Sequence, residues 1–478
     1  MSARVRRPLP TLFGGLGVAA LVLPASAQAH GIVGKADLPI PVWLFSWTAA
    51  IVLVVSFVAL STLWLTPQLQ EPRPRRLLAV PRPLEWLASA FGLGLFALVL
   101  YSGFAGVQQA PSANFAVTFI YVSFWIGMPI LSVLFGDVFA ALSPWRTCAR
   151  LLAALRRRLR ARSSEPSLRY PARLGLWPAV AGIVGFAWLE LVYVLPDRDR
   201  PSTLAALSLG YFLVMVAGMT LCGVDEWSGR ADGFGVYFNL LSRLSALTRG
   251  KDGALYLRRP LSGITDLEIR PGTIAFICAL IGTTTFDGFS NGGIWRNNEP
   301  NVQSLFADLG FSSTPALELA YSLGLVLCIL LILAVYRVGI FGVRSVSERY
   351  PSDELARTFA HSLVPIGFAY VVAHYFSLLL WQGQAMTYLI SDPLGSGANI
   401  FGTSGYQIDY HVLSYAGIWY VQVAALVTGH VGGLALAHDR ALVLYKEPEE
   451  AVRSQYWMLA VMVAFTSFGL WLLSSVGT

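Results

Sequence analysis

Histidines are the residues of this chain with the widest range of chemistry, and five of the six lie between residues 354 and 440. The five are His361, His374, His411, His430 and His438. Imidazole groups bind metal ions, transfer protons and ligate haem. The sequence around them is apolar enough to lie in a membrane, where an ionisable side chain is costly. Each of these histidines is therefore a candidate functional residue.

A metal site is the first chemistry that the sequence predicts. The candidate ligands are those that topology places near the outer face of a membrane: His30, Asp287, His374, Asp409 and His411. Histidine and carboxylate ligands suit a divalent metal such as zinc or copper, and a zinc ion with an open position activates water. Asp287 and His374 are the predicted catalytic residues. The spacings HExxH, HxH and HxxxH are absent, so the prediction depends on topology.

Haem ligation is a second possibility for the same histidines. His361 and His374 are 13 positions apart, a spacing found where one membrane helix ligates two stacked haems. The partner helix shows no matching spacing, because His430 and His438 are only 8 positions apart. A haem-bearing electron carrier is therefore the third function in order of preference.

A solute or ion pathway is the remaining alternative. Polar side chains such as Glu190, Asp287 and Gln422 would then line the interior of a helix bundle together with the histidines. Amide and imidazole groups in such a bundle also form hydrogen bonds between helices without any other role. A small-solute or metal-ion transporter thus competes with an enzyme for the same residues.

Membrane helices are the elements that must position these residues. Of the 478 residues, 55% are hydrophobic and 13% are charged, and the mean hydropathy is +0.60. In a soluble domain about a quarter of the residues are charged. Apolar runs of roughly 20 residues, enough to span about 30 Å of hydrocarbon, recur along the whole chain. We therefore expect an all-α polytopic transmembrane helix bundle, with the lipid bilayer as its partner.

Hydropathy and flanking charge predict ten membrane spans after a signal segment. Residues 1–29 have a basic start, an apolar stretch and an Ala-Gln-Ala cleavage site that ends at Ala29. Cleavage there makes His30 the first residue of a single transmembrane domain, 30–478; the alternative is an uncleaved first helix. The approximate spans are 42–65, 86–106, 115–141, 175–195, 203–223, 272–287, 314–336, 356–381, 413–437 and 455–474.

Lysine and arginine residues indicate the orientation of these spans. Of the 34 Lys and Arg residues, 27 lie in alternate loops: 66–85, 142–174, 224–271, 337–357 and 438–454. The positive-inside rule assigns these loops to the cytoplasm. We therefore predict a multi-pass protein of the cell membrane with both termini outside. The net charge of +7 follows topology, so no nucleic-acid partner is expected.

Three loops are longer than a connection requires. In the cytoplasmic loop 224–271, apolar residues recur at helical spacing: Phe234, Tyr237, Phe238, Leu241 and Leu244. They predict an interfacial or re-entrant helix, or a helix packed on the inner ends of the spans. The outer loops 288–313 and 382–412 are polar and rich in Gly and Asn, which is typical of functional loops.

Several stretches of this chain are similar to a known group of proteins. They are 29–34 (AHGIVG), 38–45 (LPIPVWLF), 143–147 (SPWRT), 285–288 (TFDG), 389–395 (LISDPLG) and 429–441 (GHVGGLALAHDRA). The chain resembles actinobacterial multi-spanning membrane proteins that carry the name fenitrothion hydrolase. The resemblance implies cleavage of an organophosphate triester, and it assigns no catalytic residue.

A membrane-embedded hydrolase is the leading prediction from these observations together. Hydrolysis of a phosphotriester needs a metal-activated water or a strong general base. The predicted outer group of histidines and carboxylates supplies either, and its substrate would be a small molecule. The sequence contains no P-loop, GxGxxG or GxSxG motif, so nucleotide-driven chemistry by this chain alone is not expected.

Overall fold

Long apolar helices make up most of the computed structural model, which describes residues 42–70, 74–160, 167–193, 199–346, 348–445 and 447–475. These residues belong to one compact unit, Ile32–Thr478. The predicted signal 1–29 and His30 lie outside the described residues. Among the described residues, nine helices are long and apolar enough to cross a membrane. An all-α polytopic helix bundle is therefore confirmed.

Each of the nine coincides with a predicted span. They are α1 (Val42–Leu63), α2 (Arg82–Ala105), α3–η4–α4 (Phe115–Phe135), α8 (Pro201–Cys222), α11 (Thr273–Ser290), α13 (Ser313–Val346), α14–α16 (Ser352–Leu389), α17 (Tyr415–Tyr445) and α18–α19 (Pro448–Leu472). The tenth predicted span, 175–195, contains the shorter helix α7 (Trp177–Leu191). Its 15 residues reach about 22 Å, less than the thickness of a bilayer core.

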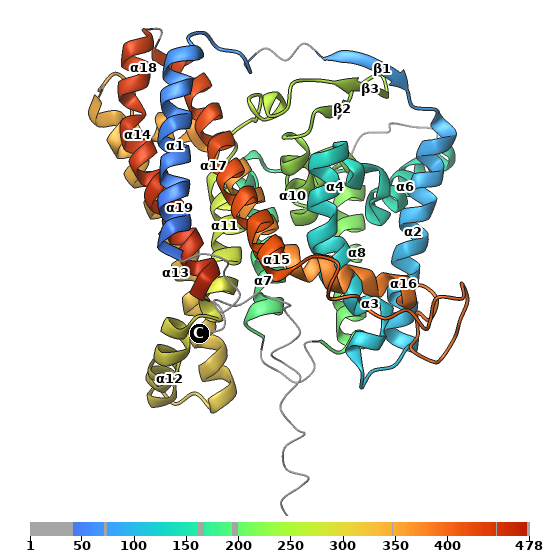
Figure 1. Ribbon diagram of the computed structural model, residues 1–478. Helices are drawn as coiled ribbons and strands as arrows, with labels where there is room; N and C mark the ends of the chain where they lie inside the picture. The colour runs from blue at the N-terminus through green and yellow to red at the C-terminus, as the bar shows by residue number, and fades with distance from the viewer. Residues whose placement is uncertain are drawn as a thin grey trace, which may run out of the picture. The chain divides into compact units, whose positions relative to one another are not determined.

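Successive long helices run in alternate directions between two ends of the unit (Figure 1). One end, which we name the sheet end, carries the strands β1 (Arg75–Ala79), β2 (Leu247–Arg249) and β3 (Ala254–Leu257). The strands form a small antiparallel sheet in the order β1-β3-β2, which joins two connections far apart in the sequence. The opposite end, which we name the α12 end, carries α12 (Gly293–Asp308) and α16 (Met386–Leu389).

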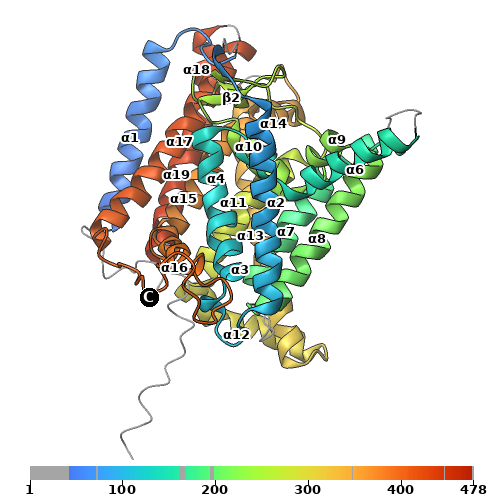
Figure 2. The same cartoon turned by 90° about the vertical axis from the view of Figure 1, so that its right-hand side faces the viewer.

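Short helices occupy the connections at both ends. They include α5 (Val138–Leu142), α6 (Pro144–Arg160), α9 (Val224–Ser228), α10 (Gly233–Ser242), α14 (Ser352–Phe359) and α18 (Pro448–Ser454). Figure 1 shows α14 and α18 toward the sheet end. Within α3–η4–α4, residues Phe119–Gly127 are π-helical. Figure 2 shows α2, α7 and α8 beside one another, with α6 running outward from them near the sheet end. The amphipathic α6 packs against α8 and α2.

The core lies around α11 and α15 (Leu363–Gln382). α11 packs against α7, α13 and α15, and α15 packs along α17. Most residues of α11 are buried, because the helix is apolar or small-sided all round. α10 is also buried, including Phe234, Tyr237 and Phe238. The helix expected in this segment is therefore present, and it packs against α7 and α4 (Met128–Phe135).

The two predicted outer loops contain more structure than their composition indicates. The loop 288–313 forms the helix α12, in which Trp295 is buried against Phe286 and Tyr321. The loop 382–412 contains α16 and packs against the end of α2. There, the Val107 amide donates to the carbonyl oxygen of Leu394 at 2.8 Å. The sequence predicted a long polar loop over 288–313, and the structure has a helix there with one buried tryptophan.

Candidate functional site

Asp287 and His374 come together in the core of the bundle. Oδ2 of Asp287 lies 2.9 Å from Nε2 of His374, and it also accepts a hydrogen bond of 2.7 Å from the Tyr375 hydroxyl. Asp287 is 1% exposed and His374 7% exposed. With Asp287 ionised, the imidazole donates through Nε2–H, so two donors compensate the burial of one carboxylate oxygen. We name these three residues the Asp287 cluster.

Two helices position the Asp287 cluster. Asp287 lies near the end of α11, three residues before Ser290, and His374 and Tyr375 are adjacent in the middle of α15. Gly288 allows close approach, because a Cβ there would lie 3.6 Å from Cε1 of His374 and 3.3 Å from Leu472. The sequence analysis did not identify Tyr375 as a site residue. The one signal for it is a hydroxyl next to a histidine inside an apolar span.

A second carboxyl group lies near this cluster. Glu190, the penultimate residue of α7, is close enough to Tyr375 to interact with it electrostatically. Both acidic residues are therefore near the α12-end termini of their helices. The arrangement can hold and exchange a proton among a carboxylate, an imidazole and a phenol at a depth where water is scarce.

Comparison with known proteins does not assign this chain to a family. No family model matches this chain, and no curated protein and no solved structure is similar to it. Its chemistry is therefore inferred from the geometry of its own side chains.

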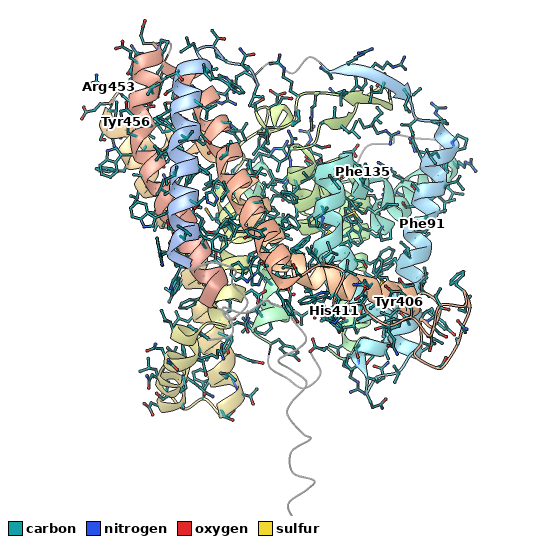
Figure 3. All side chains as sticks on the ribbon, viewed as in Figure 1. Phe91, Phe135, Tyr406, His411, Arg453 and Tyr456 are labelled. Carbon is teal, nitrogen blue, oxygen red and sulfur yellow. The ribbon has the colours of Figure 1, made fainter. Side chains whose placement is uncertain are left out.

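The other predicted metal ligands do not join this cluster. Asp409 and His411 are exposed on the connection between α16 and α17, where the Asp409 carboxylate accepts a 2.8 Å hydrogen bond from the His411 backbone amide. Figure 3 shows His411 and Tyr406 on this connection. Within the described ranges, no three His, Cys, Asp or Glu side chains come together as a metal site. The five-residue set is thus reduced to Asp287 and His374, and His30 lies outside the described residues.

The remaining buried histidines have separate surroundings. Nδ1 of His430 is 2.8 Å from the carbonyl oxygen of Leu426, within α17. His361 is 3% exposed and lines a cavity of about 400 Å³ that also includes Arg357 and Arg440. If Nε2 of His374 were to ligate a haem iron, its contact with Asp287 would first have to break.

His438 and Asp439 hold a connection in place. Nε2 of His438 lies 3.0 Å from the Trp64 carbonyl oxygen, so this nitrogen carries the hydrogen. Oδ1 of Asp439 accepts from the Trp64 indole at 3.0 Å and from the Gln68 amide at 2.5 Å. These contacts fasten the segment after α1 to α17. The role of His438 is therefore structural.

Asp232 forms a second buried polar cluster that sequence reasoning did not find. Its carboxylate accepts from the Trp145 indole at 2.6 Å and from the Tyr211 hydroxyl at 2.7 Å, and the residue is 0% exposed. Burial raises the pKa of the Asp232 carboxyl above its ordinary value of 3.8. Trp145 and Tyr211 also line an apolar cavity of about 860 Å³ between α2, α7 and α8. The cluster ties α6 and α8 to the start of α10.

Proposed function

We propose that this chain is a proton-coupled membrane transporter whose coupling site is the Asp287 cluster. The observation that carries the proposal is a buried carboxylate and imidazole, 2.9 Å apart, on two helices that are long and apolar enough to cross a membrane. A buried pair of this kind is costlier than an apolar contact of the same size, so its presence favours a functional reason. Protonation of Asp287 removes the negative charge that His374 and Tyr375 stabilise, and so weakens the contact between α11 and α15.

The proposed orientation follows from the arginine-rich connections at the sheet end. The positive-inside rule assigns that end to the cytoplasm of a cell membrane, with the α12 end and both termini outside. The Asp287 cluster then lies in the outer half of the bundle. A proton would enter from outside through Glu190 and Tyr375.

The transported species is proposed to be a small solute or a divalent cation such as Zn²⁺ or Cu²⁺, because a carboxylate and an imidazole bind either a proton or a metal.

Proteoliposomes test this proposal directly. The full chain is reconstituted in liposomes that contain a pH-sensitive dye, and Zn²⁺, Cu²⁺ or a small organic anion is added outside. We expect at least one of these solutes to change the internal pH at a saturable rate. Asp287→Asn and His374→Gln should each abolish the change. The matched controls Asp409→Asn and His411→Gln place the same substitutions on an exposed connection and should transport normally.

Two outcomes of this transport assay would contradict the proposal. If Asp287→Asn and His374→Gln both retain the wild-type rate in folded protein, the Asp287 cluster is not the coupling site. If no solute in the series changes the internal pH of liposomes that contain wild-type protein, proton-coupled transport of these solute classes is wrong.

A phosphotriester hydrolase is the second candidate, and the pairing of Asp287 with His374 favours it. A carboxylate–imidazole pair is a general base that takes a proton from water while the water attacks phosphorus and the aryl oxide leaves. However, the cavities of about 850 and 860 Å³ do not have either residue in their walls. The test is release of nitrophenol from a nitrophenyl phosphotriester. Turnover that is abolished by His374→Gln and kept by His411→Gln supports this candidate, and no turnover by wild-type protein excludes it.

A further inference from the structure

A large polar cavity opens at the sheet end of the bundle. Its volume is about 850 Å³, and its walls come from α2, α5, α6, α10 and the hairpin of β2 and β3. Six arginines line it: Arg82, Arg146, Arg150, Arg243, Arg249 and Arg258. Only two carboxylates in its wall oppose them, those of Glu85 and Asp137. We name this space the arginine cavity.

Three of the six arginines already have partners. Arg146 donates to Asp225 at 2.9 Å, and Arg249 pairs with Glu85. Arg258 donates to three backbone carbonyl oxygens at the end of α10, at 3.0 to 3.2 Å. These contacts fix the wall of the cavity. Because Glu85 is already paired with Arg249, its carboxylate does not neutralise the other arginines by contact.

The other three arginines have no such partner. Arg82, Arg150 and Arg243 make no side-chain hydrogen bond or ion pair with any residue that the structure describes. Asp137 does not neutralise them by contact, because its oxygens accept from the Ala140 amide at 3.1 Å and from Asn239 at 2.8 Å. The cavity thus presents three guanidinium groups without a side-chain partner toward one open space.

Of these three arginines, Arg243 is half-buried, whereas Arg82 and Arg150 are exposed. Partial loss of water lowers the pKa of the Arg243 guanidinium group, and the charges of Asp266 and Asp137 offset part of this effect. Desolvation and the charge of Arg146 lower the pKa of Arg150, and Asp225 and Glu85 offset part of that effect. Like charges held close together repel one another, and a bound anion reduces this repulsion. Arg146 and Arg150 are four positions apart on α6, so they project from one face of the helix.

We propose that the arginine cavity binds a ligand that carries a phosphomonoester or diphosphate group. The planar guanidinium matches phosphate oxygens in pairs, and several arginines around one volume suit a group with more than one negative charge. A volume of about 850 Å³ lies in the usual range for small-molecule sites, so the ligand is larger than free phosphate. Such a group comes either from a soluble phosphorylated compound or from an anionic lipid whose headgroup reaches the cavity.

Thermal unfolding of the full chain in lipid nanodiscs tests the proposal and separates the two sources. One arm adds inorganic pyrophosphate to protein in phosphatidylcholine nanodiscs, with chloride at equal ionic strength as the blank. The other arm replaces part of the phosphatidylcholine by phosphatidic acid. We expect a saturable rise in melting temperature in at least one arm. A rise in the first arm assigns a soluble ligand, and a rise in the second alone assigns a lipid headgroup.

A matched pair of variants shows whether the cavity is responsible. Arg150→Gln with Arg243→Gln removes two unpaired charges from the cavity and should weaken binding by roughly tenfold or more. Arg157→Gln with Arg158→Gln removes two exposed charges of α6 that do not line the cavity, and should bind as the wild type does. Equal loss in both pairs, or no response of wild-type protein in either arm, would overturn the proposal.

A further variant keeps the test valid if the cavity pair does not fold. Arg82 is exposed at the start of α2 and has no side-chain partner in the described part of the chain, so Arg82→Gln should leave the unliganded melting temperature unchanged. It should still reduce the affinity for the probe that stabilises wild-type protein. Unchanged affinity in Arg82→Gln, with the double variant also unchanged or unfolded, contradicts the proposal.

Discussion

Nε2 of His374 and Oδ2 of Asp287 are 2.9 Å apart, and this contact joins α15 to α11 in the most buried part of the bundle. The same oxygen accepts from Tyr375, so the carboxylate is the centre of the group. Asn291 also donates to Oδ1 at 3.4 Å, so loss of the carboxylate affects three donors, whereas loss of the imidazole affects the contact with Asp287 alone. The direct contact between the two side chains gives the first prediction.

A double-mutant cycle should detect coupling between Asp287 and His374. We expect Asp287→Asn and His374→Gln each to lower the free energy of unfolding by about 1–3 kcal/mol, because each leaves a buried polar partner poorly satisfied. The double variant should cost less than the sum by about 0.5 kcal/mol or more. The measurement is denaturant titration in mixed micelles. A parallel cycle with His411→Gln should be additive, since His411 is exposed; additive costs in both cycles would remove the energetic basis of the cluster.

Close packing of α17 on α15 gives the second prediction. A Cβ at Gly429 would overlap the side chain of Ala369 and lie 2.7 Å from the Pro365 carbonyl oxygen, and one at Gly433 would lie 2.7 Å from the Ser362 carbonyl oxygen. Glycines four apart allow membrane helices to approach closely. Gly429→Ala should therefore destabilise the protein by about 1–3 kcal/mol.

A glycine in open surroundings is the control for that substitution. A Cβ at Gly210 of α8 meets no atom of the described chain within 4 Å. Gly210→Ala should therefore be neutral or stabilise by up to about 1 kcal/mol through helix propensity. The same denaturant titration compares the two. If Gly429→Ala is as well tolerated as Gly210→Ala, the two helices do not depend on this close approach.

The buried carboxylate of Asp439 gives the third prediction. It accepts hydrogen bonds from Trp64, Gln68, Leu69 and Gln70, which follow α1. Asp439→Ala leaves several of these donors without a partner, so the expected loss in the free energy of unfolding is about 3 kcal/mol or more. Limited proteolysis should also begin between α1 and α2. Gln70→Ala removes one donor and should cost about 1 kcal/mol; equal costs for the two variants would show that the other donors contribute nothing.

The spans were predictable because hydropathy is a local property that adds up along the sequence. The same local counting placed Asp287 and His374 at similar depths, and in the structure they are in contact. The same reasoning also placed Asp409 and His411 near these two residues, and in the structure they lie apart from them. The connection that carries them is held by Gln384, whose side-chain oxygen accepts a hydrogen bond from the Asp409 backbone amide at 3.0 Å. Depth alone does not determine which face of a helix a residue occupies. Lateral position depends on packing between helices, which a single sequence does not reveal.

The arginine cavity shows the same limit. Each of its arginines belongs to a charged connection that was predicted correctly to lie on one side of the bundle. Counting charge grouped these connections together, yet it did not indicate that α2, α6 and α10 bring their arginines around one volume. The buried Asp232 was missed for a related reason. Its partners Trp145 and Tyr211 are 87 and 21 positions away, so no local pattern connects them.

The pH dependence of stability at Asp232 gives the last prediction. Burial raises the pKa of this carboxyl above 3.8, so the folded state holds a proton at a pH where the unfolded chain has released it. The contribution of Asp232 to stability is therefore complete below about pH 3.8 and is lost as the pH rises through the raised pKa. The excess melting temperature of wild-type protein over Asp232→Asn should thus shrink as the pH rises.

Tyr211→Phe checks the sign of that effect. The Tyr211 hydroxyl donates to Asp232 and lowers the pKa of its carboxyl in part. Without this donor the pKa of Asp232 should rise further, and the loss of stability should extend to higher pH. Thermal unfolding of wild-type protein, Asp232→Asn and Tyr211→Phe at several pH values measures both effects. An excess over Asp232→Asn that grows with pH would mean that the hydrogen bonds from Trp145 and Tyr211 outweigh burial, and that the ionised carboxylate is the form that stabilises the fold.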